Sequence, residues 1–71
     1  MERYYYYVYQ WMKDGMTMSS ASIMRVNGNF SMKRAIEFQE KSSRGNGFIL
    51  FWHEISSEDF EYMSDIFSKK D

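Results

Sequence analysis

Hydrophobic and polar positions along the chain predict three strands, two of which form a hairpin. Residues 4–12 combine aromatic and β-branched side chains, which favour extended backbone, and they predict the first strand. Asp14-Gly15 follows, a dipeptide that accepts the positive φ angles of a tight hairpin turn. Residues 16–26 alternate less regularly and predict the second strand. Residues 48–55 contain the longest apolar run of the chain and predict the third strand.

Two further segments carry helix signals. Ser31 and Ser56 each stand where a hydroxyl can cap the N-terminus of an amphipathic stretch. The first helix is expected at about residues 31–42 and the second at about 57–68. Apolar residues recur at helical spacing in the second segment, and its acidic residues lie in the first turns, where they complement the helix dipole.

These elements predict an α+β fold in the order β-β-α-β-α, built as one small domain of residues 1–71. The hairpin makes the first two strands antiparallel neighbours, and the first helix connects the second strand to the third. With the third strand beside the first, the three-stranded sheet has the order 2-1-3, a split β-α-β arrangement. We expect both helices to pack on one face of this sheet.

An aromatic face of the sheet is the candidate interaction surface. Two helices cover one face of three strands, yet large rings occur on both faces of the first and third strands. The residues expected on the uncovered face are Tyr5, Tyr7, Tyr9, Trp11, Phe48, Leu50 and Trp52. If Trp52 instead lies under the helices, the candidate face is the one with Phe51 and His53. A third interpretation is a solvated sheet, because tyrosine is amphipathic.

Composition narrows the function classes. Fourteen aromatic residues make up 20% of the 71 residues, and 27% are charged, which is typical of a folded chain. Cys is absent and His53 is the single histidine, so disulfides and most zinc sites are excluded, and we expect no metal and no cofactor. A small domain usually needs a further source of stability, and without disulfides or a metal the expected source is self-association.

Catalysis and membrane insertion are not expected. His53 has no cysteine and no convincing serine partner, and the glycines form no phosphate-binding fingerprint, so we expect no enzyme. The longest apolar run, residues 48–52, is far shorter than a membrane span, and the N-terminus lacks a signal-peptide pattern. The expected location is the cytoplasm. A net charge of −1 provides no overall basic field for nucleic acid.

The segment at residues 44–51, Arg-Gly-Asn-Gly-Phe-Ile-Leu-Phe, resembles the octapeptide of the RNA recognition motif. In that family the basic residue and two aromatic residues face the RNA, and bases stack on the rings. The resemblance implies nucleic-acid contacts by Arg44 and Phe48. Binding of single-stranded RNA or DNA through the sheet is therefore the alternative function.

A second resemblance covers more of the chain. The aromatic first strand, and residues 47–56 running into an acidic helix, are similar to short β-β-α-β-α proteins common in phage and prophage genomes. This resemblance implies an accessory protein that binds a host or viral partner. Together with the composition, it predicts a small non-catalytic module that binds a protein partner, which includes a second copy of itself in a homodimer.

Overall fold

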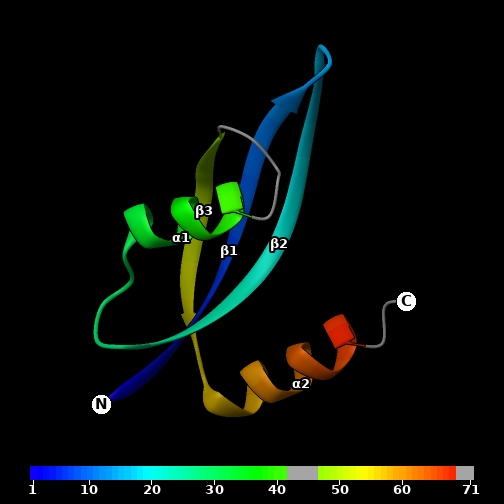
Figure 1. The fold of residues 1–71 in the computed structure, drawn as a ribbon. Coiled ribbons are helices and arrows are strands. Elements are labelled where there is room, and N and C mark those ends of the chain that lie inside the picture. The colour runs from blue at the N-terminus through cyan, green and yellow to red at the C-terminus, as the bar shows by residue number, and fades with distance from the viewer. Residues whose placement is uncertain (42–46, 69–71) are drawn as a thin grey trace.

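The computed structural model of the protein describes residues 1–41 and 47–68 and confirms the predicted fold class. Three strands form one antiparallel sheet in the order β2-β1-β3, so the predicted strand order is also confirmed. Helix α1 connects β2 to β3, which run parallel with β1 between them (Figure 1). The elements are β1 (Glu2–Lys13), β2 (Met16–Asn27), α1 (Met32–Gln39), β3 (Gly47–Ile55) and α2 (Ser57–Ser68).

The β1–β2 hairpin is long and regular. Its pairing runs without a register shift from Glu2 opposite Asn27 to Lys13 opposite Met16. Asp14 and Gly15 close it with φ angles of 54° and 76°. Two successive positive φ angles define the turn whose twist matches that of paired strands, and this is why the Asp-Gly dipeptide predicts the hairpin correctly.

The pairing of β1 with β3 contains a β-bulge. Val8 lies opposite Phe51 and Tyr9 lies opposite Ile49, so Leu50 is an extra residue without a partner in β1. A bulge inserts one residue and thereby reverses the alternation of side chains beyond it. Trp52 and Ile49 therefore share a face. Our expectation that Phe48, Leu50 and Trp52 share one face is wrong for this reason.

The core lies between the sheet and α1. Burial alternates along β1, and every second residue from Tyr5 to Trp11 is buried. The buried cluster consists of Tyr7, Tyr9, Trp11, Ala35 and Ile49, with Met24, Phe30 and Ile36 packed around it. Ala35 has no exposed surface, because its small side chain allows α1 to approach the rings of β1 closely.

The two helices pack on opposite faces of the sheet, in contrast to our expectation. Phe60 of α2 packs on Tyr4, with 4.9 Å between ring centroids, and Tyr4 points away from the face of Tyr5. In Figure 1, α1 crosses the middle of the sheet, whereas α2 lies beyond its lower end. The α1 face is already filled at that end, because Phe30 stacks on Trp52 there. Space for α2 remains on the other side.

Candidate functional site

Four of the predicted interface residues belong to the core. The exposed fractions of Tyr5, Tyr7, Tyr9 and Trp11 are 2%, 1%, 0% and 9%. Their assignment to an interface is therefore wrong, because α1 covers the face on which they lie. The aromatic side chains of this face hold the helix on the sheet.

Polar atoms in this core are satisfied by hydrogen bonds. Gln39, at the end of α1, is 2% exposed, and its Nε2 donates to Tyr7 Oη at 2.7 Å and to Ser22 Oγ at 3.1 Å. Tyr5 Oη donates to the carbonyl oxygen of Gly28 at 3.0 Å. A buried hydroxyl without a partner destabilises a fold, so these bonds explain how tyrosine serves as a core residue here.

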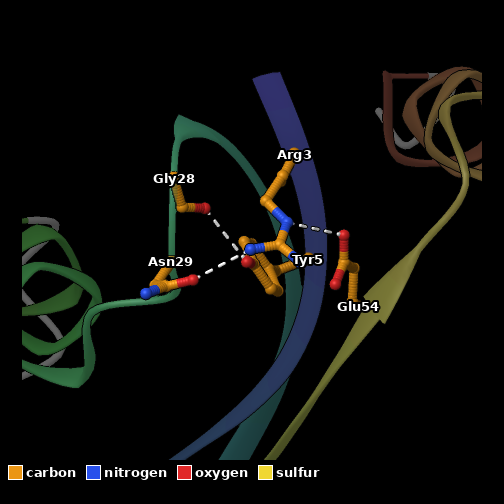
Figure 2. A network of polar contacts seen from close by, with 5 residues as sticks. All are labelled: Arg3, Tyr5, Gly28, Asn29 and Glu54. Carbon is orange, nitrogen blue, oxygen red and sulfur yellow. Dashed lines mark hydrogen bonds and ion pairs between the residues drawn. The ribbon is translucent and has the colours of Figure 1, made fainter. Parts of the chain in front are cut away.

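Arg3 links the lower ends of the three strands on the α1 face. Its Nε donates to Glu54 of β3 at 3.1 Å, and its Nη1 donates to Asn29 Oδ1, just after β2, at 2.9 Å (Figure 2). Figure 2 also shows the Tyr5–Gly28 hydrogen bond, which lies beside the two hydrogen bonds of Arg3. The four side chains fix the segment that leads from β2 into α1, so their role is structural.

Phe48, Leu50 and Trp52, the other three predicted interface residues, are all about half exposed, but the structure does not bring them together. Trp52 is on the α1 face, where its ring stacks on Phe30 with centroids 4.8 Å apart. Leu50 is the bulge residue. Phe48 lies opposite Gln10 on the other face. A shared interface role for these three residues stays a prediction.

The side of the sheet that α1 does not cover exposes several large apolar side chains, and we call it the open face. Phe51, Phe48 and Met12 are 52%, 53% and 66% exposed there. The ring of Phe51 lies 5.8 Å from that of Tyr6, and Phe51 is paired with Val8. By strand register the open face consists of Tyr4, Tyr6, Val8, Gln10 and Met12 of β1, the odd-numbered residues of β2 from Thr17 to Arg25, and Phe48, Phe51, His53 and Ile55 of β3.

The open face contains Phe51 and His53, the pair named in the second interpretation of the sequence. Tyr6, Val8 and Met12 belong to it as well, and sequence reasoning did not select them. The sequence of β1 contains a pattern that could have identified these residues as the exposed face. Its odd positions from 5 to 11 are all large rings, and the more aromatic of two faces is the better candidate for the core.

A shallow pocket lies at the hairpin end of the open face. Its volume is about 210 Å³, and its lining residues are Gln10, Trp11, Met12, Thr17, Gly47 and Phe48. Gly47 is required for the local packing, because a Cβ at this position would overlap the carbonyl oxygen of Gln10 and approach the Tyr9 ring to 2.8 Å. The pocket is smaller than most small-molecule sites, which span about 300–1,000 Å³.

Charged groups are few on the open face as far as the structure describes it. Arg25 Nε lies 3.7 Å from Glu2 Oε2, so this cation already has an anionic partner. His53 is exposed on the same face. Arg44, the predicted nucleic-acid contact, lies outside the described residues. Within residues 1–41 and 47–68, no three His, Asp or Glu side chains gather in a way that could hold a metal ion.

Neither α1 nor α2, the two helices in the described part of the chain, is long and apolar enough to span a membrane. Comparisons of the chain with protein-family models, with curated proteins and with solved structures found no match.

Proposed function

We propose that this protein is a small non-catalytic interaction module that binds a protein partner through the open face. The observation that supports the proposal is the half-exposure of Phe48 and Phe51 beside Tyr6 and Val8, on a face that α2 contacts at one end, where Phe60 packs on Tyr4. Contiguous exposed apolar surface on a small domain marks an interaction site. Aromatic side chains also dominate the energetics of protein interfaces. The expected place of this interaction is the cytoplasm.

A protein partner is favoured over nucleic acid by the charges of the open face. Nucleic-acid binding depends on Lys and Arg side chains that neutralise phosphates. In the described part of the open face, Arg25 is paired with Glu2, and His53 is the other basic group. Phe48 and Phe51 offer rings on which bases could stack, so single-stranded RNA or DNA is the alternative ligand that the experiment must test.

The test compares Phe51→Lys with Tyr62→Lys. Tyr62 lies on α2, outside the strands that form the open face, and is 69% exposed, so it is the aromatic control. A partner isolated with the wild-type protein should bind Tyr62→Lys normally and Phe51→Lys at least about 30-fold more weakly, the loss that corresponds to a hot-spot residue of 2 kcal/mol. Circular dichroism checks that both variants are folded.

Equal binding of the partner to both variants would contradict the role of the open face. A parallel titration uses fluorescent single-stranded RNA and DNA at low salt, where electrostatic attraction is screened least. If the RNA or the DNA binds in a salt-dependent way and Phe51→Lys abolishes this binding, the ligand of the open face is nucleic acid and not a protein.

A further inference from the structure

Strand β2 is an unprotected edge of the sheet. It is twelve residues long and pairs along its whole length with β1 on one side. Natural edge strands are protected against pairing with other chains by lysines, prolines, bulges or short length. Residues 16–27 contain no Pro, no Gly and no Lys, their one charge is Arg25, and their register has no shift. Strand β2 therefore lacks these four features, and its protection is limited to Arg25 and to the contact with α2 near that end.

The opposite edge of the sheet, β3, differs in this respect. It contains the bulge at Leu50, which interrupts regular pairing. The ring of Phe30, from the segment before α1, stacks on Trp52 of β3. Helix α1 also contacts β3 and crosses this strand in Figure 1, whereas it reaches the inner side of β2 through the Gln39–Ser22 hydrogen bond. Of the two edges, β2 is the one available for strand pairing.

The hairpin turn determines which backbone groups of β2 are available. In a hairpin with a two-residue loop, the flanking residues, here Lys13 and Met16, exchange both backbone hydrogen bonds. Hydrogen-bonded and non-hydrogen-bonded pairs then alternate, so even-numbered residues of β2 bond to β1. The N–H and C=O groups that point away from β1 belong to Thr17, Ser19, Ala21, Ile23 and Arg25. The Ala21 carbonyl oxygen also accepts from Ser20 Oγ at 3.4 Å, and its second lone pair remains for a partner strand.

We propose that β2 pairs in antiparallel fashion with β2 of a second copy, about a two-fold axis at Ala21. The product is one continuous sheet of six strands. Outward-pointing groups lie on odd-numbered residues, so an odd residue must face an odd residue. The register centred on Ala21 satisfies this condition over nearly the whole strand. On the α1 side it places Met18 opposite Met24 and Ser20 opposite Ser22, so that like polarities meet there. On the other side Ser19 lies opposite Ile23, and the two Arg25 side chains lie at opposite ends.

The chain exposes more surface than a compact monomer of its mass. It exposes 5377 Å², whereas a compact monomer of 8.6 kDa exposes about 4,700 Å². The excess of about 700 Å² belongs to the chain as a whole, so it agrees with self-association without locating the interface. The radius of gyration, 12.5 Å, likewise exceeds the approximately 11 Å expected for a compact chain of this length.

Dimerisation through this edge leaves the open face free. The two-fold axis stands perpendicular to the sheet, so both copies of α1 lie on one side and both open faces lie side by side on the other. In this register the hairpin end of each copy lies beside the end of β2 that α2 contacts in the other copy. The dimer uses the backbone edge of β2, whereas the proposed function depends on the side chains of Phe48 and Phe51 in β3.

The first experiment measures mass in solution by light scattering at several concentrations. We expect about 17 kDa, twice the 8.6 kDa of one chain. Ala21→Pro removes an outward N–H without removing a bond to β1, so this variant should have the mass of one chain while keeping its circular dichroism spectrum. Ala21→Val, a strand-favouring change at the same position, should remain a dimer. A single-chain mass for the wild type at all concentrations would overturn the inference.

Cross-linking tests the register without relying on a disruptive variant. The natural chain has no cysteine, so a variant with one Cys has a single thiol. Two copies of Ala21→Cys at the axis would have Cα atoms about 5.5 Å apart, within disulfide range. Two copies of Thr17→Cys would lie about 27 Å apart along the strands. We expect rapid disulfide formation for Ala21→Cys alone, and equal cross-linking of both variants would refute this register.

A third variant separates this inference from the proposed function. Phe51→Lys changes the open face and leaves the edge of β2 intact, so it should keep the mass of a dimer even where it loses a partner. Ala21→Pro should lose the dimer. If Phe51→Lys also reduces the mass to that of one chain, self-association proceeds through the open face, and the pairing of β2 with β2 is wrong.

Discussion

The hydrogen bonds of Gln39 predict a measurable contribution to stability. Gln39→Leu preserves the approximate volume of the side chain and removes its amide, which donates to Tyr7 Oη and Ser22 Oγ. Tyr7 is 1% exposed, so water does not replace the lost partner of its hydroxyl, whereas Ser22 is half-buried. A buried polar group without a partner costs about 1–3 kcal/mol. We expect this loss in the free energy of unfolding, mainly from the Tyr7 hydroxyl.

A double-mutant cycle assigns the loss to the hydrogen bond. Tyr7→Phe removes the hydroxyl that Gln39 reaches at 2.7 Å. In the double variant no Tyr7 hydroxyl remains without a partner, so its destabilisation should be smaller than the sum of the two single values by about 1 kcal/mol. Urea unfolding followed by circular dichroism provides the four free energies, with m-values that stay constant if the unfolded state is unchanged.

Gln10→Leu is the matched control for Gln39→Leu. Gln10 is a half-buried residue on the open face, so the same chemical change there should alter the free energy of unfolding by less than about 0.5 kcal/mol. Two results would refute the reasoning. One is a Gln39→Leu protein as stable as the wild type. The other is additivity of Gln39→Leu and Tyr7→Phe within about 0.3–0.5 kcal/mol, the range found for independent sites.

Three other predictions concern packing, pH and helix capping. Gly47→Ala should destabilise the fold by about 1–3 kcal/mol in urea unfolding, because its Cβ would meet Gln10 O and the Tyr9 ring; no loss would contradict this close approach. In the folded state the pKa of Tyr9 is raised, mainly by burial and further by nearby negative charge. Stability should therefore decrease as pH rises above about 10, less so in Tyr9→Phe; an identical decrease would exclude Tyr9 as the cause. Ser31→Ala should lower thermal stability by about 0.5–2 kcal/mol, since Ser31 Oγ accepts the Arg34 N–H at 3.2 Å; an unchanged melting temperature would argue against this cap.

Local signals account for the parts of the fold that could be predicted. The Asp14-Gly15 turn needs positive φ angles in two successive residues, and this requirement is independent of the rest of the chain. Ser31 and Ser56 cap helices through bonds to the N–H groups three residues later, at 3.2 Å and 3.1 Å. Because each signal acts over only a few residues, the elements, their order and the hairpin pairing follow from the sequence.

The candidate site depends on contacts that such signals do not contain. Leu50 is inserted as a bulge between Phe51 and Ile49, and this shift moves Trp52 to the face opposite Phe48. Nothing within residues 48–55 marks the position of the bulge, because all of residues 48–52 are large and apolar. Alternation counted along the sequence therefore assigns these side chains to faces incorrectly.

Amino-acid sequence alone determined that this chain forms a hairpin, a crossover helix, a central aromatic strand and a capped second helix. Tertiary structure decided which aromatic face became the core. Both faces of β1 are hydrophobic enough to be buried, so the choice depended on long-range fit. Ala35 allows α1 to approach the rings closely, Gln39 satisfies Tyr7, and Gly47 leaves room for Tyr9. These partners are 24 to 38 residues apart in sequence, and for this reason the open face became visible only once the chain was folded.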